Sequence, residues 1–271
     1  MDDKIIAVYC LCDDLLIAMN HHEDPQCHMS DAQVMTTAIV AALYFRGNYE
    51  TARQLLLEQG YIPTMLGKSR FNRRLHRIKS MFLTLFAVLS EVFKELNIDS
   101  IYVIDTLPIP VCDNWRIPRA KLYQGEAYRG YHASKRRYFY GLKIHLLVTK
   151  AGEPVEFFLT CGSFNDTKGL QYFDFDLPPG SEVFGDKSYN DYEIEDVLSD
   201  TGIHLKPIRK KNSHRLLEPW QCYLQSYHRK IVETTNSMIE RLLPKSIHAV
   251  TAEGFELKVV LFCLACSLNY L

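Results

Sequence analysis

Apolar residues over the first 97 positions recur at the spacing of an α-helix. Ser30 or Asp31 can cap one of these helices, and Gly47 and Gly60 are residues at which a helix can end. The pattern predicts helices over residues 4–19, 31–45, 49–59 and 69–96. We therefore expect an all-α region in the first part of the chain.

The last of these segments is expected to form a long helix or a helix pair with two different faces. Apolar residues from Phe71 to Leu89 make one stripe. Arginines at i, i+3/i+4 and i+7 spacing make the other face, namely Arg70, Arg73, Arg74 and Arg77. A short helix, a turn and a helix with a basic face are typical of a helix-turn-helix DNA reader. An ordinary solvated face is the alternative, and this pattern alone leaves both open.

Near residue 98 the pattern changes to short apolar runs of the kind that form strands. Residues 101–104 predict a buried strand that ends at Asp105, because Pro108 and Pro110 follow. Further strands are expected over 138–149, 155–160, 182–184 and 204–208, with helices over 191–198, 220–242 and 252–268. This order predicts an α/β domain with a mixed sheet flanked by helices, and ribonuclease-H-like folds have this order.

The length allows one large globular domain or two smaller ones. The chain has 271 residues, of which 47% are hydrophobic and 23% charged, so disorder and fibrous structure are excluded. We expect an all-α, helix-turn-helix-like domain over residues 1–97 and a ribonuclease-H-like domain over residues 98–271.

The net charge of −1 argues, taken as a single number, against a nucleic-acid partner. The charge is segregated, however. Residues 64–80 hold six bases and no acid, residues 115–145 eight bases and one acid, and residues 204–245 nine bases and three acids. Residues 165–200 reverse the balance with ten acids. Three basic blocks favour a polyanionic partner, and the acidic stretch between them suits divalent metal.

Other features bear on the compartment. The first residues do not have the form of a secretory signal, because Asp13 and Asp14 interrupt the apolar stretch. The longest late apolar run, residues 259–268, is half of the roughly 20 residues that a membrane span needs. The eight cysteines lack zinc-ribbon spacing, so buried free thiols are expected. We therefore expect a cytoplasmic protein with no membrane partner.

Two aspartates are predicted at the ends of buried strands, where a charge needs compensation. They are Asp105 and Asp186, and the ends of neighbouring strands can lie close together. Carboxylates that converge from rigid elements can hold two Mg²⁺ ions about 3.5–4 Å apart for phosphoryl transfer. A strand-end turn or cap is the alternative for both residues. Asn165 or Asp166 is expected to cap a short helix, and for Asp166 a cap is favoured over metal binding.

A third carboxylate is expected from the helix over residues 220–242. Glu233 and Glu240 share nearly the same face because they are seven residues apart, and Arg229 lies one turn before Glu233. For each glutamate taken singly, a surface salt bridge is the simpler interpretation.

Three segments carry a resemblance to a known family: VIDTLPIPVCDN at 103–114, GDKSYND at 185–191 and YHRKIVETTNSMIERLLPK at 227–245. They resemble the three signature regions of bacterial insertion-sequence transposases of the DDE type. Residues 134–148 and 154–170 are also typical of these enzymes, so the similarity covers nearly the whole chain. The resemblance implies a ribonuclease-H-like catalytic domain close to the Tyr-Arg-Glu-Lys branch.

The resemblance carries the family's two aspartates onto Asp105 and Asp186, and its glutamate onto Glu233. It implies that these residues hold two Mg²⁺ (or Mn²⁺) ions per active site. The implied function is cleavage of the insertion sequence's ends and joining of the 3′-hydroxyl ends to target DNA. The implied partners are double-stranded DNA, with terminal inverted repeats and target, and a second copy in a homodimeric synaptic complex at the nucleoid. A transposase-derived DNA binder and another ribonuclease-H-like nuclease are the alternatives.

Further residues are expected around this site. A lysine follows the glutamate by about seven residues in the Tyr-Arg-Glu-Lys branch, and Glu240 stands there in this chain. Auxiliary roles are possible for Glu240, Arg241, Lys187 and Tyr189. Besides the four arginines of 70–77, the expected DNA contacts are Lys135, Arg136, Arg137, Arg209, Lys210, Lys211 and Arg229. Aromatic residues alternate with basic residues over 115–143, and this mixture suits stacking on unpaired nucleobases.

Overall fold

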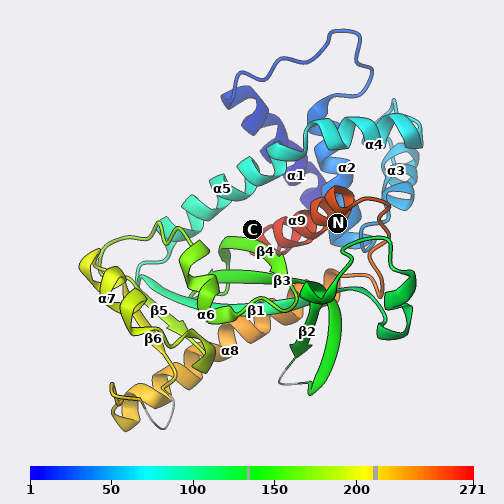
Figure 1. The fold of residues 1–271 in the computed structure, drawn as a ribbon. Helices are drawn as coiled ribbons and strands as arrows, with labels where there is room; N and C mark the ends of the chain where they lie inside the picture. Colours follow the sequence, from blue (N-terminus) through cyan, green and yellow to red (C-terminus); the bar gives the residue numbers. More distant parts are fainter. Residues whose placement is uncertain (133–134, 210–212) are drawn as a thin grey trace. The chain divides into compact units, whose positions relative to one another are not determined.

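The computed structural model describes residues 1–132, 135–209 and 213–271 (Figure 1). The chain forms two compact units, one from Met1–Val88 together with Ile239–Leu271 and the other from Leu89–Met238. The C-terminal segment thus groups with the N-terminal helices rather than with the sheet. The functional division expected between residues 97 and 98 remains a prediction.

The first unit is helical, as predicted. Its helices are α1 (Asp2–Ala18), α2 (Asp31–Tyr44), α3 (Tyr49–Glu58), α4 (Lys68–Arg77), the first half of α5 (Lys79–Leu96) and α9 (Ala252–Ser267). Helix α2 lies at the core and packs against α1, α3, α4 and α9. Ser30 caps α2: its Oγ accepts from the backbone N–H of Gln33 at 3.1 Å, and Gln33 Oε1 accepts from the Ser30 N–H at 2.9 Å. The predicted cap at Ser30 is confirmed.

The expected arginine face of α4 loses one member, because Arg74 points into the unit. Its guanidinium donates to Asp31 Oδ1 at 2.6 Å and to Glu23 Oε2 at 2.9 Å. It also donates to the carbonyl of Met29 at 2.6 Å, and the side chain is only 8% exposed. Two carboxylates thus offset the cost of removing this charge from water. The exposed arginines of the face are Arg70, Arg73 and Arg77.

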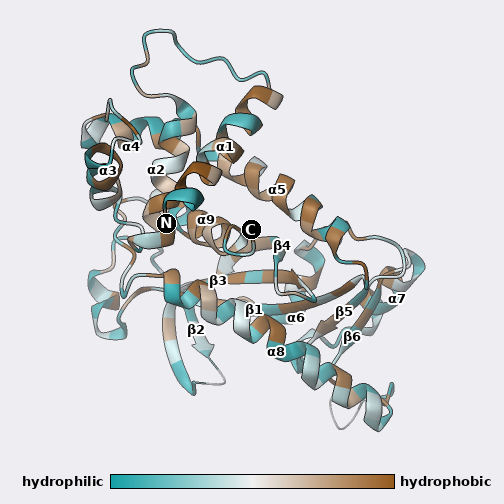
Figure 2. Cartoon of the chain, turned by 180° about the vertical axis from the view of Figure 1, so that it is seen from behind, coloured by the Kyte–Doolittle hydropathy of each residue, from teal (hydrophilic) through white to brown (hydrophobic). Residues whose placement is uncertain are grey.

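The second unit contains a six-stranded mixed sheet. Its strands are β1 (Ile101–Cys112), β2 (Arg129–His132), β3 (Arg137–Thr149), β4 (Pro154–Cys161), β5 (Glu182–Gly185) and β6 (His204–Pro207). Strand β3 pairs antiparallel with β1, β2 and β4, whereas β5 pairs parallel with β1 and β6 parallel with β5. The predicted mixed sheet is confirmed. Strand β3 is buried along most of its length, and Figure 2 shows both hydrophobic and hydrophilic stretches along it.

Strand β1 is longer than predicted. It continues through Pro108 and Pro110 to Cys112, and Asp105 lies inside it rather than at its end. The partner β3 pairs with β1 along its whole length, but β5 pairs with β1 only up to Val103. Beyond Val103 one side of β1 is therefore an edge, where a proline without an N–H is tolerated.

Helix α8 (Pro219–Leu242) crosses one face of this sheet (Figure 1). Gln225 donates to the carbonyl of Pro207 on β6 at 3.0 Å, and the His228 ring stacks on Phe184 of β5 with centroids 4.5 Å apart. Farther along, Thr235 donates to a carbonyl of the turn between β3 and β4 at 2.7 Å. These contacts hold the middle of α8 close to β1.

The second unit also contains several shorter helices. They are η1 (Asn114–Arg119), η2 (Glu126–Tyr128), α6 (Asp166–Gly169), η3 (Leu170–Tyr172), η4 (Lys187–Tyr189) and α7 (Tyr192–Asp200). Asp191 caps α7 by accepting from the backbone N–H of Glu193 at 3.2 Å.

Two expectations from the composition can be compared with the structure. No helix within the described parts of the chain is long and apolar enough to cross a membrane. Cys12, Cys263 and Cys266 are buried free thiols, as expected, but Cys10 and Cys222 are exposed.

Candidate functional site

Asp105 and Asp186 occupy equivalent positions on two neighbouring parallel strands. The last paired residues of β1 and β5 before them are Val103 and Phe184, and each aspartate follows two residues later. Adjacent strands lie about 4.8 Å apart and side chains alternate with a period of two. The register therefore places both carboxyl groups on the same side of the sheet, where β5 ends.

The Asp186 carboxyl is held by the turn that follows β5. Its Oδ1 accepts from the backbone N–H of Ser188 at 2.6 Å and also from the Ser188 hydroxyl. Gly185 directly before it lets the chain pack closely, since a Cβ there would stand 3.0 Å from Ile104 and from Tyr189. The position of this carboxyl is thus fixed by local structure.

The pKa of Asp105 is set by its burial and by the charged groups around it. Burial raises the pKa of Asp105 to about 7, and the Asp186 carboxylate adds to this shift. Asp166 raises the pKa further, whereas the backbone N–H of Thr106 and the Arg229 guanidinium lower it. A divalent cation among these groups would favour their charged forms.

Asp166 belongs to this surrounding, although the sequence predicted only a helix cap for it. The cap of α6 is Asn165, whose Oδ1 accepts from the backbone N–H of Thr167 at 2.8 Å. Asp166 instead forms a 2.8 Å ion pair with Lys143 of β3, whose Nζ also donates to the Phe164 carbonyl at 2.8 Å. Of the two expected caps, Asn165 is confirmed and Asp166 is wrong, and the Asp166 carboxylate pairs with Lys143 and acts electrostatically on Asp105.

Helix α8 contributes Asn236 to the site, a residue that sequence reasoning missed. Its Nδ2 donates to Asp105 Oδ2 at 3.1 Å. Glu233 lies on the same face one turn earlier, where Arg229 Nε stands 3.1 Å from its Oε1. The Glu233 side chain is 53% exposed, and its carboxylate is paired with Arg229 in this structure.

The three carboxylates expected to hold metal do not form a tight cluster here. Among the described residues, three metal-ligating side chains come within 4.8 Å of one another at His21, Glu23 and Asp31. Arg74 is bound to both of those carboxylates, so a guanidinium already balances the charge of that cluster.

The auxiliary candidates are placed differently from one another. Tyr189 is fully buried, and its pKa is raised well above the usual value by burial and by the nearby carboxylates. It is therefore a packing residue beneath the Asp186 turn, whereas Lys187 is exposed. Glu240 and Arg241 are exposed in the last turn of α8, within the first compact unit.

The predicted DNA contacts also divide. Arg209 forms a two-pronged ion pair with Glu195, with Nη2 2.8 Å from Oε2, and its side chain is 11% exposed. This arginine therefore stabilises α7 against β6 rather than facing solvent. Lys135, Arg136 and Arg137 are exposed where the β2–β3 hairpin enters β3. Lys210 and Lys211 lie outside the described residues.

Comparison with known proteins identifies the family of the chain. Residues 95–248, more than half of the chain, match the family described as the transposase DDE domain. The chain therefore belongs to the transposase DDE domain family. No curated protein matches the chain. Among solved structures it is similar to a piggyBac transposase synaptic complex with hairpin DNA, at 9% identity and a TM-score of 0.48, covering 100% of this chain and 72% of that one.

Proposed function

We propose that the chain is the transposase of a bacterial insertion sequence. It cleaves the ends of its element and joins the 3′-hydroxyl ends to target DNA. The register of β1 against β5 carries this proposal, because it brings Asp105 and Asp186 to the same side of the sheet where β5 ends. Membership in the transposase DDE domain family supports the same class of reaction.

The donor set fits divalent cations. Asp105 and Asp186 offer hard oxygen ligands, and the pKa of Asp105 is raised mainly by burial and further by the carboxylates of Asp186 and Asp166. Glu233 supplies a third carboxylate once its pair with Arg229 opens. Two Mg²⁺ or Mn²⁺ ions, when bound, activate a water or hydroxyl oxygen and stabilise the leaving oxygen in phosphoryl transfer.

The chain's own residues position these groups. Asn236 holds one oxygen of Asp105, and Ser188 holds one oxygen of Asp186, so neither carboxyl rotates freely. Arg229 supplies a fixed positive charge beside Asp105, suited to a DNA phosphate. Held geometry and charge neutralisation are the main contributions that phosphoryl transfer needs from a protein.

The DNA surface of the second unit lies at the exposed β2–β3 hairpin. Strand β3 pairs with β1 around Asp105 and continues into the β2–β3 hairpin. There Tyr131 and Tyr138 face each other across the strands, with ring centroids 5.0 Å apart and with exposures of 50% and 61%. Exposed aromatic rings beside exposed basic side chains suit stacking on nucleobases. Because two ends must be joined in one event, we propose that the active form is a homodimer on chromosomal DNA.

The proposal is tested with purified protein, a duplex carrying the ends of its own element, and Mg²⁺ or Mn²⁺. Wild-type protein should yield cleaved and joined strands on a denaturing gel. Asp105→Asn should bind the duplex but neither cut nor join it. Asp113→Asn, an exposed aspartate on the segment after β1, is the matched control and should retain both steps.

Three outcomes contradict the proposal. Cleavage and joining by Asp105→Asn at the wild-type rate would remove Asp105 from the site. Binding by wild-type protein without metal-dependent cutting would make the chain a DNA-binding protein derived from a transposase. Cleavage of branched DNA without joining would make it a junction resolvase.

A further inference from the structure

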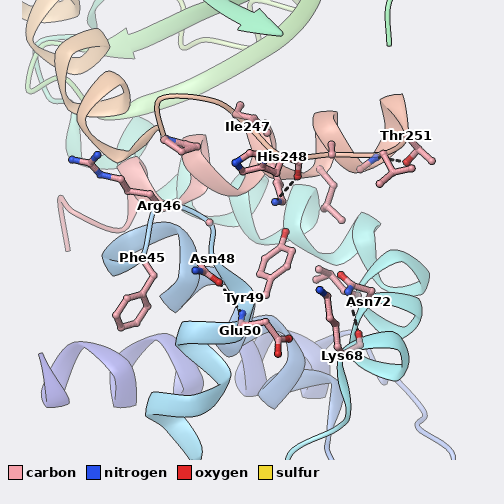
Figure 3. Close-up of a pocket in the computed structure, with 18 of the residues that line it drawn as sticks. Phe45, Arg46, Asn48, Tyr49, Glu50, Lys68, Asn72, Ile247, His248 and Thr251 are labelled. Atoms are coloured by element: carbon pink, nitrogen blue, oxygen red, sulfur yellow. Dashed lines mark hydrogen bonds between the residues drawn. The ribbon is translucent and has the colours of Figure 1, made fainter. Parts of the chain in front are cut away.

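A cavity of about 1040 Å³ opens in the first compact unit (Figure 3). Its walls come from three separate segments, which are Phe45–Glu50 at the start of α3, Lys68–His76 on α4, and Pro244–Lys258, which leads into α9. The volume is at the upper end of the roughly 300–1,000 Å³ that is usual for ligand sites. None of these residues belongs to the carboxylate site described above.

The lining is electropositive. Three cationic side chains, Arg46, Lys68 and Lys258, line the cavity against a single carboxylate, Glu50. That carboxylate forms an ion pair with Arg53 one turn along α3. In the described part of the chain, none of the three cations has an acidic partner. The cavity therefore carries positive charge that the protein itself does not neutralise.

Lys258 is the most enclosed of the three cations. Its Nζ donates to the carbonyl of His248 at 2.8 Å and lies 5.1 Å from the centroid of the Tyr49 ring. Burial lowers the pKa of this ammonium group. A half-buried ammonium held only by a carbonyl and a ring face gains from an anion nearby.

Three helices begin at the cavity wall and add to its positive potential. Asn48 caps α3 by accepting from the Glu50 N–H at 3.1 Å, and Thr251 caps α9 by accepting from the Gly254 N–H at 3.1 Å. Helix α4 begins after Gly67 without a side-chain cap. The start of α4 therefore keeps its positive helix end available beside Lys68.

We propose that this cavity binds the sugar-phosphate backbone of DNA, so that the first compact unit holds a transposon end here as well as through the exposed arginines of α4. The inference rests on the proposed function for its DNA partner. A single small anion, a few times the roughly 30 Å³ of a water molecule, would leave most of the 1040 Å³ unfilled. The cations stand on three different segments, so the cavity can contact more than one phosphate group, and Figure 3 shows the Tyr49 ring between Arg46 and Lys68, where it can contact a sugar.

The test measures binding to a duplex with the element's ends, in EDTA so that no cleavage occurs, over a range of salt concentrations. The variant is Arg46→Gln combined with Lys68→Gln, both exposed positions, and a thermal melt checks that it folds like the wild type. Its affinity should fall about tenfold or more, and the slope of log K against log salt should become shallower by about two. Lys4→Gln removes a cation that is bonded to Asn269 outside the cavity, and it should leave both values unchanged.

The outcomes separate this inference from the proposed function. If the wild type binds the end duplex and the double variant binds it with the same affinity and salt slope, the inference is overturned and the proposed function stands. Failure of the wild type to bind any end duplex overturns both. If inorganic phosphate or a mononucleotide protects the wild type but not the double variant from thermal unfolding, while DNA affinity is equal in both, the cavity serves a free phosphate ligand and the inference is wrong.

Discussion

The side-chain amide of Asn236 on α8 donates a hydrogen bond to Oδ2 of Asp105 on β1, across 3.1 Å and 131 positions of sequence. The bond links the helix to the strand at Asp105, whose carboxyl also interacts electrostatically with Asp186. Helix α8 therefore orients one carboxyl group directly, in addition to carrying Glu233 on the same face.

Replacing Asn236 with alanine should slow end cleavage about tenfold or more without weakening DNA binding. A hydrogen bond to a charged group contributes about 1.5–3 kcal/mol, and this one acts on the orientation of Asp105. Single-turnover cleavage at saturating DNA measures the effect. Ser237→Ala, at the exposed neighbouring position, should change the rate less than twofold. An equal loss in both variants would indicate a weakened helix instead of a displaced carboxyl.

The raised pKa of Asp105 predicts a pH-dependent stability. Below pH ~4 the Asp105 carboxyl is protonated in both the folded and the unfolded protein, and its contribution to the free energy of unfolding is fully present. As the pH rises toward the folded-state value of about 7, the unfolded chain loses its proton first, and that stability is lost. Asp105→Asn should therefore be more stable than wild type at pH 8, by on the order of 2–4 kcal/mol, and equal at pH 4. Urea unfolding in EDTA at both pH values decides this, and an identical difference at the two values would refute it.

Features fixed by neighbouring residues could be predicted from the sequence. The start of α2 depends on Ser30 and Gln33, which are three residues apart, and the cap of α7 depends on Asp191 and the residues after it. Asp186 follows a short apolar strand directly, so its place at the strand end also follows from local pattern. In each case the interaction that decides the structure lies within a few residues.

Features that depend on distant partners could not be predicted. Whether Pro108 ends β1 depends on which side of the strand is paired, and that is set by β5, more than 70 residues away. Arg74 has the spacing of a surface residue, but its partner Asp31 lies 43 positions earlier. Asn236 gave no chemical signal, since an amide on a half-polar helix is ordinary until its contact with Asp105 is known.

The ion-pair network of Arg74 predicts a large difference between two adjacent arginines. Arg74→Met should destabilise the protein by about 3–5 kcal/mol, because it leaves the buried carboxylate of Asp31 without its guanidinium partner. Arg73→Met, at the next and exposed position, should change the stability by about 0.5 kcal/mol or less. Chemical unfolding monitored by circular dichroism checks both. A small loss of stability for Arg74→Met would show that His21 or solvating water stabilises the Asp31 carboxylate instead.

Glu233→Gln should abolish metal-dependent cleavage without changing stability. The Arg229–Glu233 pair is largely exposed, at 42% and 53%, and exposed pairs contribute only about 0–1 kcal/mol, so a lost activity reports a lost ligand. Cleavage on a denaturing gel is measured beside a thermal melt, with Glu218→Gln, an exposed glutamate just before α8, as the control that should cut normally. Glu240→Gln is the decisive comparison. If Glu240→Gln stops cleavage while Glu233→Gln still cuts, the third carboxylate is Glu240, about two turns farther along α8, and the assignment of Glu233 is wrong.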